Sequence, residues 1–293
     1  MTYDVVILGK GPAGMSAAIY LARGGHSVLA IGKDSGSLER AETIENYYGF
    51  PEPITGAELA ALGVRQAERF GVAILDEEVT GLEMTELDHG IGFAAHTPTG
   101  EYKARTVLLA TGKRRTALKV PGFEEFRGSG ISFCATCDGF FYKGKKVAVI
   151  GAGDYAASEL ADLLPFTSDI TLFTNGQPIA SSRFPEGLHV IDAAISAFEG
   201  GDRLSAIATV DGERHSIDGA FIALGTAGAT DFAAKIGIET AGSDIVVNES
   251  FMTNVPGVFA AGDCVGGFYQ VAKAVSDGAI AAKAMGSFLK GGE

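Results

Sequence analysis

The stretch DVVILGKGPAG (residues 4–14) decides the fold of this chain. An apolar run of strand length leads directly into a glycine motif, and residues 13–23 then show the apolar spacing of a helix. In that order Gly9 makes a tight turn, Gly11 lets the backbone approach a pyrophosphate, and Gly14 lets helix and strand pack closely. The proline suits the first position of a helix, whose free N–H groups attract an anion. The stretch therefore predicts a β-α-β unit that binds a dinucleotide.

A second copy of the pattern, KVAVIGAGDYA, occupies residues 146–156. Each copy has a strand of its own that ends in small residues, Ala110-Thr111-Gly112 for the first and Ala223-Leu224-Gly225 for the second. We therefore predict an α/β fold of two Rossmann-like, three-layer domains, the second inserted in the first. The expected boundaries are 1–115 with 245–293 for the first domain and 116–244 for the second.

The charge of the chain limits the partners that it can have. It carries 23 Lys and Arg against 36 Asp and Glu, which argues against non-specific binding to nucleic acid or to anionic membranes. No apolar run approaches the ~20 residues that a membrane-spanning helix needs. The N-terminus lacks the basic region of a signal peptide. We expect a cytoplasmic protein in a reducing compartment.

Two of the three cysteines stand in the stretch Cys134-Ala135-Thr136-Cys137-Asp138. In a reducing compartment such a pair serves redox or metal chemistry more often than structural stapling, although it can also be inert. A zinc site needs two more ligands, and no paired spacing is found among the five histidines His26, His89, His96, His189 and His215. Dinucleotide-type units on both sides favour the redox alternative. Cys264 is expected to be a small buried residue rather than a third redox centre.

The rest of the chain reads as short buried strands and amphipathic helices. We expect helices over 57–70 and 271–289, and a further helix that is opened by residues 151–156 and runs to about residue 164. We expect strands over 26–31, 106–110, 170–173 and 258–261, and an antiparallel meander over 73–82, 92–97 and 101–103. Asp263 follows a strand that would face a cofactor, where it can accept hydrogen bonds from sugar or ribityl hydroxyls. Gly32 and Lys33 stand where an acidic residue often ends the second strand and holds a ribose. This disfavours NAD at the first site and is compatible with FAD.

With these motifs the chain resembles the low-molecular-weight thioredoxin reductase family of flavoproteins. The matching stretches, in the family's order, are residues 9–14, 44–51, 110–112, 134–139, 151–154 and 255–263. The resemblance implies FAD in the outer domain, a middle domain that normally holds NADPH, and a homodimer. It also implies that Cys137 faces the flavin, that Cys134 attacks the disulfide of a partner, and that Asp138 donates and accepts protons for the pair.

The resemblance further implies which positions hold the cofactor, with Gln270 and Val271 near the pyrimidine edge of the flavin. The full set expected to bind FAD is Gly9, Gly11, Pro12, Ala13, Gly14, Gly32, Lys33, Leu38, Asn46, Val79, Ala110, Thr111, Gly112, Gly262, Asp263, Gln270 and Val271.

The sequence departs from this family mainly in the middle domain. Family members carry several arginines after the second strand of that domain and grip the 2′-phosphate of NADPH with them, but here residues 174–178 read TNGQP, and the next basic residue is Arg183. Each charge-assisted hydrogen bond to a phosphate is worth roughly 1.5–3 kcal/mol, so losing two weakens binding about a hundredfold or more. Asn175 is not the carboxylate that the ribose of NADH prefers. Tyr155 replaces a small residue at the glycine turn, and Phe268-Tyr269-Gln270 replaces Tyr-Arg-Gln.

Three functions therefore stay open. We favour an FAD-dependent disulfide oxidoreductase of the thioredoxin reductase type, in which electrons come from a donor such as ferredoxin, pass through the flavin to Cys134 and Cys137, and leave to thioredoxin or a similar protein disulfide. One alternative is a conventional NADPH–thioredoxin reductase. The other is a flavoprotein whose middle domain holds a second flat ligand, such as a flavin on Tyr155, as an electron relay or sensor.

Three residue assignments also have a plainer alternative. Asp138 could serve only to cap the following turn, and Tyr155 could be a solvent-facing helix residue. The run Lys113-Arg114-Arg115 is interpreted first as solvated charge and second as a docking patch for an acidic partner.

Overall fold

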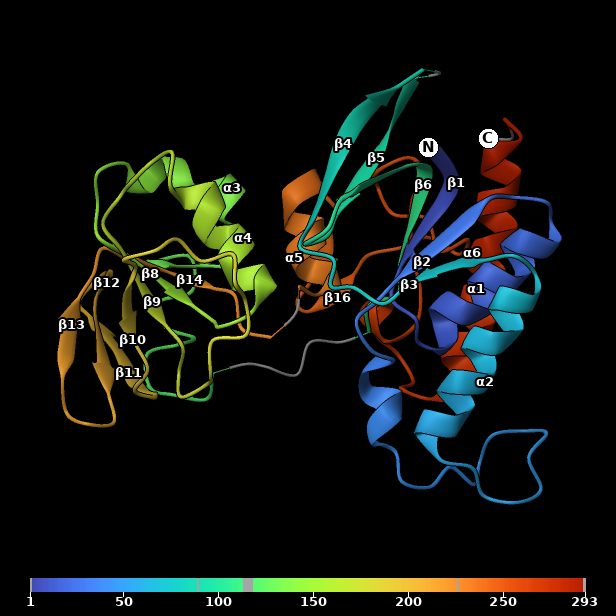
Figure 1. Ribbon diagram of the computed structural model, residues 1–293, viewed down its shortest axis with the longest axis horizontal. Coiled ribbons are helices and arrows are strands. Elements are labelled where there is room, and N and C mark those ends of the chain that lie inside the picture. Colours follow the sequence, from blue (N-terminus) through green and yellow to red (C-terminus); the bar gives the residue numbers. More distant parts are fainter. Residues whose placement is uncertain (1, 89, 113–117, 226, 292–293) are drawn as a thin grey trace. The chain divides into compact units, whose positions relative to one another are not determined.

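The chain folds into two compact units, which are described separately (Figure 1). The computed structural model describes residues 2–88, 90–112, 118–225 and 227–291. Unit 1 comprises Met1–Arg114 and Gly228–Glu293, and unit 2 comprises Arg115–Ala227. The tripeptide Lys113-Arg114-Arg115, expected as a charge run or docking patch, lies outside the described residues.

The return of the chain to unit 1 occurs earlier than we expected. We expected the chain to return to the first domain at residue 245, whereas in the structure unit 1 resumes at Gly228. The reason is helix α5 (Ala229–Ile236), which packs against β4 (Gly81–Leu87) and β16 (Asp244–Ile245) of unit 1. Such a docking contact leaves no mark in the local sequence pattern.

Unit 1 is built on a seven-stranded sheet of order β3-β2-β1-β6-β5-β4, in which β17 also pairs with β6. Strands β1, β2, β3, β17 and the C-terminal half of β6 are parallel to one another, so their carboxyl ends meet at one edge. The strand bounds are Thr2–Leu8 (β1), Val28–Ile31 (β2), Ala73–Leu75 (β3), Gly90–His96 (β5), Glu101–Leu109 (β6) and Val258–Ala260 (β17).

The expected antiparallel meander is present, but with different strands. Residues 73–82 do not form one strand, because β3 pairs in parallel with β2 and β4 begins only at Gly81. The meander consists of β4, β5 and β6. The expected strands 101–103 and 106–110 are a single strand, β6. Its residues 103–109 pair with β1, its residues 101–104 pair with β5, and its residues 107–109 pair with β17.

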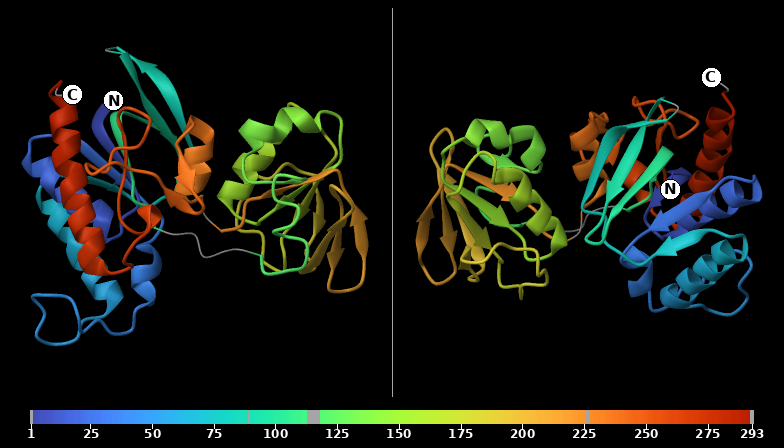
Figure 2. Two further views of the ribbon diagram at one scale, coloured as in Figure 1. Left: turned by 180° about the vertical axis from the view of Figure 1, so that it is seen from behind. Right: turned by 45° about the horizontal axis from the view of Figure 1, so that its top comes forward.

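Three long helices cover the sheet of unit 1. Helix α1 contacts both α2 and α6, and the views of Figure 2 show α6 running beside α1. The hydroxyl of Ser16 on α1 donates to the carbonyl of Val275 on α6 at 2.7 Å. The helical elements are Pro12–Arg23 (α1), Gly36–Arg40 (η1), Gly56–Arg69 (α2), Asp263–Val265 (η3) and Val271–Leu289 (α6).

Unit 2 repeats the plan on a smaller scale. Its five-stranded sheet has the order β10-β9-β8-β14-β7 and all of its pairings are parallel. A separate three-stranded antiparallel sheet of β11, β12 and β13 lies between β10 and β14 in the chain. The elements are Ile131–Ser132 (β7), Ala135–Asp138 (α3), Gly139–Tyr142 (η2), Val147–Ile150 (β8), Asp154–Leu163 (α4), Ile170–Phe173 (β9), His189–Ile191 (β10), Ile195–Gly200 (β11), Leu204–Thr209 (β12), Arg214–Ser216 (β13) and Gly219–Ile222 (β14). The expected second β-α-β unit is therefore β8-α4-β9.

Among the described residues, no helix combines the length and the apolar character needed to cross a bilayer.

The contact between α1 and α6 generates a test of packing. A Cβ at Gly278 would lie 2.1 Å from the carbonyl oxygen of Ala13, so Gly278→Ala must push the two helices apart. We expect the free energy of unfolding of the FAD-loaded protein to fall by about 1–3 kcal/mol, measured by urea titration. Gly286→Ala in the same helix is the control, because its nearest neighbour is a His26 ring atom at 3.4 Å. Equal stability of the two variants would contradict this packing.

Candidate functional site

The first glycine turn has the shape that a dinucleotide needs. Gly9 has φ +116° and a Cβ there would lie 2.3 Å from the carbonyl oxygen of Ala110, while a Cβ at Gly14 would lie 2.0 Å from that of Gly9. A Cβ at Gly11 would meet nothing within 4 Å. The turn is thus packed against the end of β6 on one side and is open at Gly11, where a pyrophosphate would approach.

The start of helix α1 leaves its N–H groups to a ligand. The N-cap is Gly11, which makes no side-chain capping bond, Pro12 is the first helical residue, and no acidic residue stands in the first turn. Such a helix start offers backbone donors and a partial positive charge to an anion. The residues present therefore fit the pyrophosphate of FAD.

The predicted residues that follow β6 and β17 meet at this same edge of the sheet. Gly262 has φ +86° and its Cβ position lies 2.9 Å from the Cβ of Ala13, so the end of β17 touches the first turn of α1. The buried hydroxyl oxygen of Thr111 has no hydrogen-bond partner among the described residues. It is a polar atom available to a ligand at the place where Ala110, Thr111 and Gly112 were predicted to bind one.

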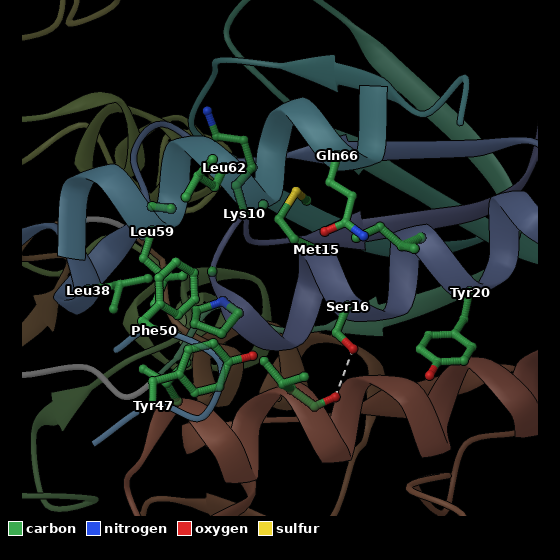
Figure 3. A pocket seen from close by; sticks show the side chains of 17 residues that line it. Lys10, Met15, Ser16, Tyr20, Leu38, Tyr47, Phe50, Leu59, Leu62 and Gln66 are labelled. Carbon is green, nitrogen blue, oxygen red and sulfur yellow. Dashed lines mark hydrogen bonds between the residues drawn. The ribbon is translucent and has the colours of Figure 1, made fainter. Parts of the chain in front are cut away.

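A second group of predicted residues lies around the start of α6. The amide of Asn46 donates to the side-chain oxygen of Gln270 at 3.1 Å, although 224 residues separate them. An apolar pocket of about 300 Å³ adjoins the glycine turn and includes four predicted residues, Gly11, Pro12, Leu38 and Val271, in its lining. Figure 3 shows the rings of Tyr47 and Phe50 together at one end of this pocket, stacked with centroids 6.0 Å apart.

Two ion pairs that were not predicted from the sequence lie near the end of β2. The amine of Lys33, which stands where an acidic residue often ends this strand, lies 3.5 Å from a carboxylate oxygen of the buried Glu78. Lys10 makes a similar ion pair with Asp76. Both acids follow β3, the parallel neighbour of β2, so the carboxylates at this edge come from the next strand. Val79, also predicted to bind FAD, is buried and follows Glu78 in the chain.

The thiol pair lies in unit 2 and is joined as a disulfide. Cys134 and Cys137 have Cα atoms 5.3 Å apart at the start of the short helix α3. Cys134 is 3% exposed, whereas Cys137 is exposed. The Sγ of Cys134 accepts a hydrogen bond from the backbone N–H of Cys137 at 3.2 Å. Cys137 is therefore the more exposed residue of the pair in this form.

Asp138 points back toward the thiol turn. Its carboxylate accepts a hydrogen bond from the hydroxyl of Ser132 at 2.7 Å, and the same hydroxyl oxygen accepts the N–H of Cys134 at 3.1 Å. Asp138 makes no side-chain capping bond to η2, so the alternative that it only caps the following turn is wrong. Ser132 connects an acid to the backbone of Cys134, and its position two residues before the pair was the only sequence signal for it.

Two side chains of helix α4, one helical turn apart, form hydrogen bonds to the backbone on either side of Cys134. Tyr155 is fully buried, and its hydroxyl makes a long hydrogen bond of 3.4 Å to the carbonyl of Phe133. Glu159 is 1% exposed and accepts the N–H of Ala135 at 2.7 Å. Tyr155 is therefore neither the solvent-facing residue nor the open stacking surface that the sequence analysis considered. Glu159 was missed, although an acid on the apolar face of the expected helix 154–164 was a usable signal.

The third cysteine is buried, as predicted. Cys264 is buried and its thiol donates toward the carbonyls of Leu109 and Ala261, both at 3.3 Å. Burial raises the pKa of this thiol to about 12. Since the thiolate is the reactive form, Cys264 does not compete with the disulfide pair at neutral pH.

The second glycine turn has the same backbone geometry as the first, but no Lys or Arg stands in residues 174–182, which follow β9. Gly151 has φ +157° and its Cβ position lies 2.2 Å from the carbonyl of Ala223, the same close approach as in unit 1. After β9 the chain turns at Asn175, whose side-chain oxygen accepts the N–H of Ile195 at 2.8 Å. All residues of the connection 174–188 are described; none is helical, and Arg183 is its only basic residue.

Comparison with known proteins agrees with this geometry. Residues 3–278 match the family model described as pyridine nucleotide-disulphide oxidoreductase. The chain is 35% identical to thioredoxin reductase of Treponema pallidum, over 98% of this chain and 97% of that protein.

Two solved structures resemble the whole chain. The atypical thioredoxin reductase TRi of Desulfovibrio vulgaris Hildenborough is 40% identical with a TM-score of 0.92, and the alignment covers 99% of this chain and 98% of that one. A ferredoxin-flavin thioredoxin reductase of Clostridium acetobutylicum is 29% identical with a TM-score of 0.76, and covers 99% of both chains. The chain therefore belongs to the pyridine nucleotide-disulphide oxidoreductase family, as an FAD-binding oxidoreductase of the thioredoxin reductase type that acts on disulfides.

Proposed function

We propose that the chain reduces the disulfide of thioredoxin or of a similar protein through the Cys134–Cys137 pair, with electrons from a donor such as ferredoxin rather than from NADPH. When bound, FAD supplies the electron pair that opens the disulfide. The residues predicted to bind FAD would hold it along the carboxyl edge of the unit 1 sheet. The homodimer and the cytoplasmic location stay predictions.

We assign separate roles in the reduction of the protein disulfide to Cys137, Cys134 and Asp138 of unit 2. Cys137 is the sulfur exposed in the oxidised form, which suits contact with the flavin. Cys134, once reduced, attacks the partner disulfide as a thiolate, and Cys137 then displaces the partner's second thiol, so one disulfide forms as the other breaks. We assign proton transfer to Asp138, and its link to the backbone of Cys134 through Ser132 supports this role. Because Cys134 is 3% exposed in the disulfide form, the turn must open before this attack.

The end of β9 is the single observation that carries the donor assignment. In the described segment 174–182 there is no Lys or Arg, and the side chain of Asn175 is engaged with the backbone of β11. A 2′-phosphate there would lack charge-assisted hydrogen bonds worth roughly 1.5–3 kcal/mol each. The likeness to a protein named ferredoxin-flavin thioredoxin reductase supports ferredoxin as the donor.

A conventional NADPH–thioredoxin reductase is the second candidate, because the glycine turn at Gly151 retains the close backbone approach that a dinucleotide needs. A second flavin in unit 2 has less support, since Tyr155 is fully buried and offers no open ring face.

The donor is tested by following the flavin absorption without oxygen. We expect reduced ferredoxin to bleach the purified protein within seconds, and micromolar NADPH to leave it oxidised, because the missing cations weaken binding about a hundredfold or more. Dithionite serves as the control that all of the flavin can be reduced. Rapid bleaching by micromolar NADPH would replace this proposal by the second candidate.

The thiol pair is tested by Cys134→Ser. We expect the variant to lose at least about a thousandfold in thioredoxin disulfide reduction, since the attacking sulfur is gone, while the donor still reduces its flavin. Cys264→Ser is the matched control, because Cys264 is buried in unit 1 and should not affect turnover. Turnover that survives Cys134→Ser would show that another route carries the electrons.

A further inference from the structure

Lys273, in the first turn of helix α6, contacts three hydrogen-bond acceptors of unit 1. Its side-chain nitrogen lies 2.9 Å from the carbonyl oxygen of Gly262, 2.6 Å from that of Gly266 and 2.8 Å from a carboxylate oxygen of Asp277. Because each of these partners is an acceptor, the nitrogen supplies three hydrogens, as an ammonium group does. All of its donors are therefore engaged with the protein.

These contacts hold both ends of one short loop. The loop, residues 262–266, includes the helical turn η3 and carries Asp263, and we call it the Asp263 loop. Lys273 binds the carbonyl groups of its first and last residues, and Asp277 accepts the N–H of its first residue at 3.1 Å. Since Lys273 and Asp277 are four residues apart, they lie together on one face of α6.

The backbone of the Asp263 loop depends on such contacts for its conformation. Gly262 and Gly266, at its two ends, have φ of +86° and +74°. Glycine can adopt these angles, but it also allows many others, so it does not by itself fix the path of the chain. The thiol of Cys264 anchors the middle of the loop to the carbonyl of Leu109 at 3.3 Å, and Lys273 anchors the ends.

We propose that Lys273 is a positioning residue for FAD, which fixes the Asp263 loop relative to the start of helix α6. Asp263 is predicted to bind the sugar or ribityl hydroxyls of the cofactor, and Gln270 and Val271 its pyrimidine edge. Lys273 connects the two groups through one side chain, which is 21% exposed. The proposal rests on the predicted role of Asp263 and does not depend on the electron donor or the protein substrate.

The experiment measures how much FAD leaves the FAD-loaded protein on dilution, from the fluorescence of the released cofactor, which gives a dissociation constant. We expect Lys273→Met, which keeps the length of the side chain but removes its three donors, to raise this constant at least about tenfold. Lys283→Met is the matched control, because Lys283 is an exposed lysine of the same helix, and it should stay within about twofold of the wild type. FAD release from Lys273→Met that equals that of the control would overturn the proposal.

A double-mutant cycle distinguishes positioning from a general loss of stability. Asp263→Ala alone should raise the dissociation constant at least about tenfold, since it removes a charged acceptor. If Lys273 acts by placing Asp263, adding Lys273→Met to Asp263→Ala should raise the constant less than about threefold further. Two effects that multiply in full would refute the positioning role, and so would an Asp263→Ala variant that holds FAD as the wild type does.

Asp277→Asn keeps the test decisive if Lys273→Met does not fold. It retains the shape and one acceptor oxygen, but Lys273 loses its charged partner. We expect the dissociation constant to rise at least about threefold, and the rise to disappear when Asp263 is already alanine. An unchanged constant in folded Asp277→Asn would contradict the proposal.

Discussion

Both units depend on one constraint, the close approach of a glycine backbone to the strand next to it. In unit 1 a Cβ at Gly9 would lie 2.3 Å from the carbonyl of Ala110, and in unit 2 a Cβ at Gly151 would lie 2.2 Å from that of Ala223. No side chain fits at such distances, so each turn requires glycine with positive φ. The constraint fixes where helices α1 and α4 begin, and with them everything that the two helix starts can bind or support.

The same backbone geometry carries different chemistry in the two units because the surrounding side chains differ. In unit 1 the turn is joined by Thr111, Gly262 and the loop that carries Asn46, which together suit a flavin dinucleotide. In unit 2 the strand β9, which would meet the adenosine half of a nicotinamide dinucleotide, ends at Phe173 and is followed by Thr174 and Asn175, without a cation. A fold can therefore keep its dinucleotide shape after the charges that select the ligand are gone.

The sequence predicted most of what depends on local pattern. Helix α6 and strand β9 have the predicted bounds, and the glycine turns lie where their motifs placed them. What failed depends on contacts between distant segments. The pairing of β3 with β2 and the packing of α5 on β4 are contacts between distant segments, and the apolar periodicity of the sequence does not specify them. Ser132 and Glu159 were not predicted for the same reason: only the folded chain brings their side chains to the backbone N–H groups of Cys134 and Ala135.

Helix α4 connects these observations physically. Its first residue follows the glycine turn of unit 2, and its buried face bears Tyr155 and Glu159 against the thiol turn. A ligand bound at the start of α4 would act on the same rigid element that holds Cys134, so binding there and the state of the disulfide would be coupled through one helix. Under the proposed function no electrons arrive at this helix start, and the buried Tyr155 in its first turn fits that function, since its ring fills the interior and its hydroxyl reaches the carbonyl of Phe133. Helix α4 would then act on the thiol turn alone.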